Sequence, residues 1–388
     1  MNRLGLLTAV SLLLCAMAPG IVAYTVGLYD FAVSSGPYFV PQHALVLYLA
    51  VPLVMLGIII SILSPGLFLA ARFVSTPTFS TWLLSGFGFS FLLVSFAAGL
   101  GEFATQRLFL DRAFIVLLTL INLACYLIAK SDRAERTLAG IAWRKHRHEI
   151  TAMITLPVVI LVFFLPKFFW ENLNGDTAHV LFSSKLLLGS MNPYWPETGG
   201  PYASDPGFAT SLTNYANAWF LRLFGETEFS IRALVLICMP VLFTAFMALI
   251  RHGKNQINEA RTVLFVALAL GLASFVFMYS AAYDPYRADM ATPMAREMLL
   301  MICYFGFILF YLEKRVWLTA LFSALTVLVV PSGMPLLGFW VAASVVCLRP
   351  IPIRMAAITV ASVFVCLVVS VLLPIILGAY GQPVPGGE

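Results

Sequence analysis

The sequence predicts an all-α, polytopic membrane protein with about eleven transmembrane helices and an external loop that contains short interfacial helices. Three observations support this prediction. Hydrophobic residues make up 61% of the 388 positions and charged residues only 11%, against roughly 25% charged residues in soluble domains. Several apolar stretches reach the ~20 residues that a ~30 Å hydrocarbon layer requires. Basic residues collect in a few short segments, as they do beside membrane helices.

Each predicted span is an apolar run that ends at charged, proline or glycine residues. The predicted spans are 4–24, 45–71, 82–100, 112–129, 152–169, 229–250, 262–281, 296–312, 316–330, 334–348 and 355–378. The two short runs between 316 and 348 meet at a Pro-Ser-Gly sequence, so we expect a helical hairpin there rather than one long helix. The first run has two interpretations, an uncleaved anchor, which we favour, or a cleavable signal.

The densest cluster of basic residues, at 130–149, predicts the orientation of the chain. Short basic segments stay on the cytoplasmic side of a membrane, and counting outward from this cluster puts every other one on the same side. These segments contain Arg72, Arg251 with Lys254 and Arg261, Lys314 with Arg315, and Arg349 with Arg354. His146 and His148 lie within the cluster, and we interpret both as surface charge.

The basic cluster at 130–149 divides the predicted spans into two regions. Residues 1–149 form an N-terminal region of about four spans that ends in the basic loop, and residues 150–388 form a second transmembrane module. The second module carries two predicted external loops, 171–228 and 282–296. The six cysteines all lie in apolar runs without a CxxC pair, which indicates buried hydrophobes rather than disulfides or a metal site.

The long external loop predicts surface helices. Apolar residues recur at helical spacing from Thr177 to Leu188, and Asp176 stands immediately before them, where a carboxylate caps a helix. A second amphipathic run extends from Ser211 to Phe224. Such helices lie along a membrane surface, with Trp195 and Trp219 at the level of the headgroups.

The order of motifs across about residues 150–350 resembles the GT-C superfamily of polytopic glycosyltransferases, in particular the bacterial relatives of protein mannosyltransferases and aminoarabinose transferases. The matching residues are Gly175-Asp176, His179, Gly189, Asn192-Pro193-Tyr194, Leu223-Phe224-Gly225 and Ser230-Ile231-Arg232. The sequence departs from the family pattern because four spans precede the module and no second acidic residue adjoins Asp176. We also expect no large external domain after the last span.

The resemblance implies transfer of a sugar from a polyprenyl-phosphate carrier to a lipid, glycan or protein acceptor on the external face of the membrane. A hydroxyl acceptor needs a carboxylate to take its proton, and Asp176 is the candidate base. The alternative is that Asp176 only caps a helix. His179 follows three residues later and would share a helix face with Asp176, where it would orient the carboxylate or contact substrate.

The leaving lipid phosphate needs cationic stabilisation. The candidate phosphate-binding residues at external membrane edges are Lys185, Arg232, Arg287 and Arg296. Contact with lipid headgroups is the alternative role for each of them. Tyr194 and Trp195 are candidates for stacking on the sugar, with interfacial anchoring as the alternative.

A divalent cation, Mg²⁺ or Mn²⁺, is a further candidate at the predicted site. Asp176, Asp284 and Asp289 would supply the carboxylate oxygens that hard cations prefer. A salt bridge from the two loop aspartates to Arg287 explains the same residues without a metal.

The predicted location is the bacterial inner membrane with the active site on the periplasmic side, and the predicted partners are lipid-linked sugar donors and membrane lipids. The sequence has no stripe of Lys and Arg that alternates with aromatic residues, so we do not expect a nucleic-acid partner. Two alternatives stay open, a transporter or flippase of lipid-linked glycans and an envelope polysaccharide polymerase or ligase. The nearly charge-free runs from 45 to 129 favour surface chemistry over a transmembrane pathway.

Overall fold

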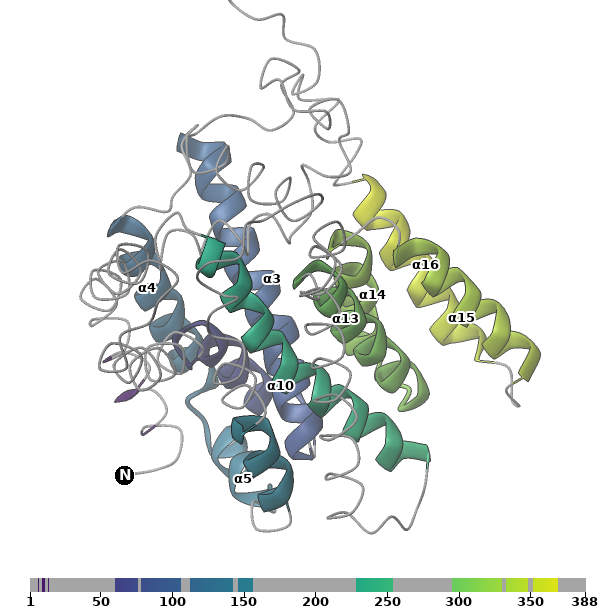
Figure 1. Cartoon of the computed structure of the whole chain (residues 1–388), viewed down its shortest axis with the longest axis horizontal. Coiled ribbons are helices and arrows are strands. Elements are labelled where there is room, and N and C mark those ends of the chain that lie inside the picture. Colours follow the sequence, from purple (N-terminus) through teal and green to yellow (C-terminus); the bar gives the residue numbers. More distant parts are fainter. Residues whose placement is uncertain are drawn as a thin grey trace, which may run out of the picture.

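The regular elements of the protein are helices. A computed structural model describes residues 6, 9–10, 13, 60–75, 78–105, 112–141, 146–155, 228–253, 295–329, 333–347 and 352–368. Every regular element in these ranges is helical, so the all-α prediction is confirmed for them (Figure 1). Four predicted spans fall largely or wholly outside the described residues, at 4–24, 45–71, 152–169 and 262–281.

Seven of the eight labelled helices overlap predicted apolar runs, and α5 is the exception. Their bounds are Phe79–Thr105 for α3, Arg112–Ala129 for α4, Asp132–Gly140 for α5, Glu228–Gly253 for α10, Ala295–Leu312 for α13, Val316–Val329 for α14, Gly333–Cys347 for α15 and Ile353–Leu367 for α16. The bounds of α4 are those predicted, and α13 and α14 each differ by one residue at one end. Shorter helices cover 60–73 and 147–155.

The prediction of about eleven transmembrane helices is corrected for the described part of the chain, although α3 and α10 have 27 and 26 residues. Among the described residues, no helix combines the length and the apolar composition needed to cross a membrane. The helices α14, α15 and α16 have 14, 15 and 15 residues, and at ~1.5 Å per residue they extend only about 21–23 Å. The 18 residues of α4 and of α13 reach about 27 Å by the same measure.

The hairpin predicted near residue 331 is confirmed. The first helix, α14, ends at Val329 and the second, α15, begins at Gly333. A Cβ atom on Gly333 would lie 2.4 Å from the carbonyl oxygen of Thr326. Glycine therefore allows α15 to begin directly against the last turns of α14.

One helix was not predicted. The segment at 130–149, expected to be a basic loop, contains α5 at Asp132–Gly140. Ser131 caps this helix by accepting a hydrogen bond from the backbone N–H of Ala134. Ala134, Leu138 and Ile141 are buried at i, i+4 and i+7, so α5 packs against the body through one apolar stripe.

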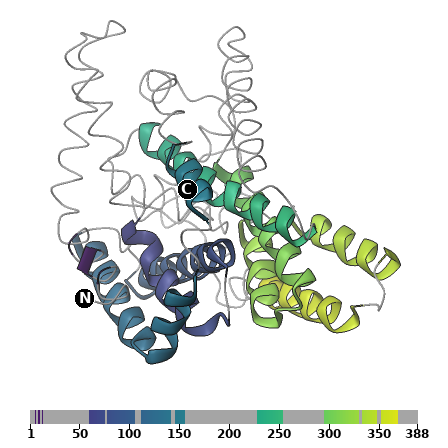
Figure 2. The ribbon, with the colours of Figure 1, turned by 90° about the horizontal axis from the view of Figure 1, so that it is seen from below.

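The long helix α10 lies between two groups of helices. It packs against α3 on one side and against α13 on the other, and α14 packs in turn against α13, α15 and α16 (Figure 1). Seen from below, residues 60–155 lie on one side of α10 and α13–α16 on the other (Figure 2). Phe322 of α14 is fully buried where three helices meet. Gly88 of α3 and Gly306 of α13 make room for its ring, because a Cβ on either would lie within 3.0 Å of it.

Candidate functional site

Most of the residues predicted to form the catalytic site lie outside the described part of the chain. These residues are Asp176, His179, Lys185, Tyr194, Trp195, Asp284, Arg287 and Asp289. The candidate cation site formed by the three aspartates lies outside the described part for the same reason. Two predicted phosphate-binding residues belong to described helices, since Arg232 lies near the start of α10 and Arg296 near the start of α13.

The helices that carry Arg232 and Arg296 run in the same direction. Near the end of α10, Arg251 donates a hydrogen bond to Ser80 at the start of α3, with 2.8 Å between Nη1 and Oγ. Just after α13, Arg315 donates to the carbonyl oxygen of Ser75, which precedes α3, at 3.0 Å. Both helices therefore end beside the start of α3, and both begin at the opposite end of the body.

This parallel packing brings two distant parts of the sequence to one end of the protein. The helices pack directly, with 4.6 Å between the ring centroids of Phe246 and Phe305. The predicted external loop 171–228 leads into α10, and the loop 282–296 leads into α13. The first turns of α10 and α13, with Arg232 and Arg296, thus share one end of the helix pair. At ~1.5 Å per residue, that end lies about 28 Å along α10 from Arg251.

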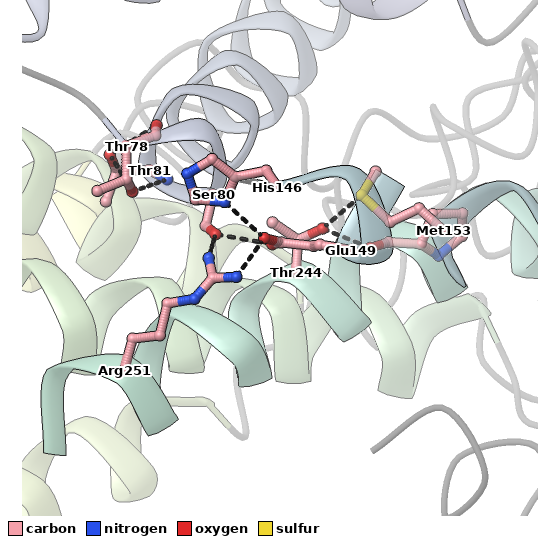
Figure 3. A network of polar contacts seen from close by, with 9 residues as sticks. Thr78, Ser80, Thr81, His146, Glu149, Met153, Thr244 and Arg251 are labelled. Carbon is pink, nitrogen blue, oxygen red and sulfur yellow. Dashed lines mark hydrogen bonds and ion pairs between the residues drawn. The ribbon is translucent and has the colours of Figure 1, made fainter. Parts of the chain in front are cut away.

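A second polar centre occupies the other end of α10, around the carboxylate of Glu149 (Figure 3). Arg251 forms an ion pair with Glu149, with 2.7 Å between Nη2 and Oε2. Ser80 donates to Oε1 at 2.7 Å, and His146 Nδ1 lies 3.1 Å from Oε2. Because a carboxylate only accepts hydrogen bonds, the ring nitrogen of His146 is the donor. We call these four residues the Glu149 cluster.

The Glu149 cluster holds its carboxylate in the charged form. Glu149 is fully buried, with 0% of its side chain exposed. Burial raises the pKa of Glu149, but the hydrogen bonds from His146 and Ser80 and the charge of Arg251 outweigh this effect, so the pKa lies below its ordinary value. The carboxylate is therefore ionised at neutral pH and fully engaged with its partners.

Glu149 has a structural role rather than a catalytic one. A general base needs access to a substrate proton, and Glu149 is both buried and paired with an arginine. The cluster instead connects the start of α3, the helix at 147–155 and the end of α10. It thereby joins the two predicted regions, 1–149 and 150–388, by a buried ion pair.

The interpretation of His146 as surface charge is wrong, whereas the predicted surface position of His148 is confirmed. His146 is 7% exposed and packs on Phe79, with ring centroids 5.8 Å apart. His148 is exposed. Sequence reasoning also missed Glu149 and Ser80. The available signal was an acidic residue at the end of a basic segment, three positions after a histidine, as expected for a pair on one helix face.

Three of the basic residues grouped on one side by the sequence, Arg72, Arg251 and Arg315, lie together in the structure, whereas Lys254, Arg261 and Arg349 lie outside the described residues. Arg72 donates to Ser131 at the start of α5, with 3.0 Å between Nη1 and Oγ. Arg251 and Arg315 meet the residues around the start of α3, as described above. We call this end of the helices the basic end.

Apolar side chains are exposed on two opposite flanks of the body. On α4 the exposed residues Val116, Leu120, Leu123 and Leu127 follow helical spacing. The opposite flank, formed by α15 and α16 in Figure 1, exposes Phe339, Val346, Ile353, Val360 and Phe364. Continuous apolar stripes of this kind indicate a surface that contacts an apolar partner or lipid.

Four cysteines that the structure describes, Cys125, Cys238, Cys303 and Cys366, are buried free thiols, as predicted. Among the described residues, no three histidine, cysteine, aspartate or glutamate side chains gather as metal ligands would. A comparison of this chain with protein-family models, curated proteins and solved structures found no match.

Proposed function

We propose that this protein is a membrane glycosyltransferase that takes a sugar from a polyprenyl-phosphate donor and passes it to an acceptor on the external face. The observation that carries the proposal is the parallel packing of α10 and α13. This packing brings Arg232 and Arg296 to the end where both predicted external loops enter the helices. The motifs that resemble glycosyltransferases lie in and beside the first of these loops.

The two arginines fit the demands of this reaction. When the sugar leaves its lipid phosphate, negative charge develops on the phosphate oxygens, and preorganised cations stabilise it. Arginine binds phosphate in a bidentate manner and keeps its charge at any physiological pH. Asp176 supplies the carboxylate that accepts the proton of the acceptor hydroxyl.

The surface of the body supports a membrane location. Apolar side chains face outward on two opposite flanks, whereas a single protein partner would cover one patch. Basic segments gather at the end away from Arg232 and Arg296, as expected for the cytoplasmic side of a bilayer. The proposed catalytic end therefore faces the periplasm or the cell exterior.

The test is transfer of radiolabelled sugar from a polyprenyl-phosphate donor by the purified full chain in detergent. Asp176→Asn keeps the size of the side chain and much of its capping ability, and we expect it to abolish transfer and donor hydrolysis. Asp132→Asn, the same change at the first residue of α5, should leave the rate unchanged. Full activity of the Asp176→Asn variant would reduce Asp176 to a helix cap. If the wild-type protein binds a panel of donors without turnover, that result would favour a transporter over a glycosyltransferase.

A further inference from the structure

The turn between α13 and α14 holds a lysine in an unusual backbone conformation. Lys314 has a φ angle of 57°, which is the left-handed region that glycine normally occupies. The N–H of Arg315 bonds to the carbonyl oxygen of Phe310 at 2.9 Å, and that of Lys314 to Tyr311 at 3.2 Å. These two bonds define a Schellman motif, in which glycine is the usual residue at the position of Lys314. A lysine here carries backbone strain, which points to a use for its side chain.

The surroundings of Lys314 contain two exposed aromatic side chains. Arg315 pairs with Glu313, with 2.5 Å between Nε and Oε2, and donates to the carbonyl oxygen of Ser75. These contacts hold the segment that contains Phe73 beside the turn. Phe73 is 60% exposed and Trp317 is 84% exposed, and Lys314 is exposed as well. We call Phe73, Lys314 and Trp317 the aromatic–lysine patch.

The charge around the patch is positive. Lys130, Arg136 and Arg147 are exposed at the same basic end. The acidic side chains described there offset this charge only in part, because Glu149 is buried against Arg251, Glu313 pairs with Arg315 and Glu135 is half-buried. An anionic surface is therefore the complementary partner.

We propose that the aromatic–lysine patch binds the headgroups of anionic phospholipids. The Lys314 ammonium would contact the headgroup phosphate, and the rings of Phe73 and Trp317 would lie at the level of the lipid interface, where aromatic side chains anchor membrane proteins. The apolar flanks of the body continue away from this end and supply the adjoining acyl contact. This inference rests on the membrane location proposed above and is independent of the catalytic site.

The experiment is native mass spectrometry of the full chain released from detergent micelles that contain equal amounts of phosphatidylglycerol and phosphatidylcholine. We expect the wild-type protein to retain phosphatidylglycerol preferentially. Lys314→Gly should lower the ratio of the two retained lipids about fivefold, which is the effect of one lysine at an anionic surface. The variant should fold, because glycine relieves the strain at this turn, and its melting temperature in lipid-free detergent should match or exceed that of wild type.

Two further variants separate charge from general apolar contact. Lys314→Arg should keep the preference, and Phe339→Ser, which changes an exposed ring in the middle of α15, should leave the ratio unchanged. An unchanged ratio in Lys314→Gly, or equal retention of the two lipids by the wild-type protein, would overturn the proposal. Neither outcome involves sugar transfer, so a failure of the lipid site is distinguishable from a failure of the glycosyltransferase proposal.

Discussion

Arg251 and Glu149 come from distant parts of the chain and form a buried ion pair, with 2.7 Å between Nη2 and Oε2. The pair fixes the end of α10 against the start of α3 because Arg251 also donates to Ser80. These contacts fix the position of one end of α10 relative to its neighbours. Arg232 lies near the other end of the same helix. The Glu149 cluster is thus a structural anchor at the opposite end from the proposed catalytic site.

Replacing Glu149 by glutamine is expected to destabilise the protein. Arg251 would keep its charge and lose its anion, and one hydrogen-bond acceptor would become a donor. Breaking a buried pair costs about 3–5 kcal/mol, and we expect about 1–3 kcal/mol here because a quarter of the Arg251 side chain is exposed to solvent. Thermal unfolding in detergent measures the change. Glu313→Gln, at the more exposed pair with Arg315, should cost less than about 1 kcal/mol. Equal losses in the two variants would contradict the anchoring role.

The stability of the protein should fall in acid through protonation of Glu149. The folded-state pKa of this group lies below its ordinary value of 4.5, so the folded state binds fewer protons than the unfolded state in this range. The contribution of Glu149 is therefore fully present above the ordinary pKa and is lost as the pH falls through the folded-state value. Unfolding curves at a series of pH values below 4.5 should show a decline in wild type that is smaller in Glu149→Gln. Parallel curves for the two proteins would assign the acid sensitivity to other groups.

The contact between the helix at 60–73 and α3 should not tolerate a methyl group at Gly66. A Cβ there would lie 1.9 Å from the carbonyl oxygen of Gly86, which is backbone and cannot move aside. Gly66→Ala should therefore destabilise by about 1–3 kcal/mol, as overpacking does elsewhere. Gly140→Ala is the matched control, because no atom lies within 4 Å of its Cβ position. This control should be neutral or stabilising by up to about 1 kcal/mol, since alanine favours helices. A melting temperature of Gly66→Ala equal to that of wild type would contradict the close approach.

Removing either arginine at the shared end of α10 and α13 should impair use of the lipid-linked donor. Hydrogen bonds to charged groups contribute about 1.5–3 kcal/mol, so Arg232→Gln and Arg296→Gln should each lower kcat/KM about 10–150-fold. Arg232→Lys should retain part of the activity, because it keeps the charge but loses the bidentate geometry. Arg136→Gln, at the basic end, serves as the control and should leave kcat/KM unchanged. Full activity in both glutamine variants would remove the two arginines from the proposed site.

The sequence predicted helix bounds well where apolar runs are bounded by charges or by proline and glycine. It identified α4 to the residue and placed a helix break between Val329 and Gly333. It missed α5, although Ala134, Leu138 and Ile141 already show the spacing of a buried stripe, because the many charges favoured a loop. The prediction of transmembrane spans rested on composition along the chain, and no helix in the described part of the chain combines the length and the apolar composition that a span needs.

For the described residues, the sequence by itself determined the helical class, the burial of four cysteines and the grouping of Arg72, Arg251 and Arg315 at one end. These properties follow from composition and local periodicity, which act over neighbouring residues along the chain. Only the tertiary structure decided that Glu149 is a buried anchor, that His146 is its partner rather than surface charge, and that α10 and α13 begin at one end. The physical reason is that an ion pair such as Glu149–Arg251 depends on three-dimensional proximity. Burial then determines the energy of the pair. Neither the proximity of the two residues nor their burial follows from how far apart they lie in the sequence.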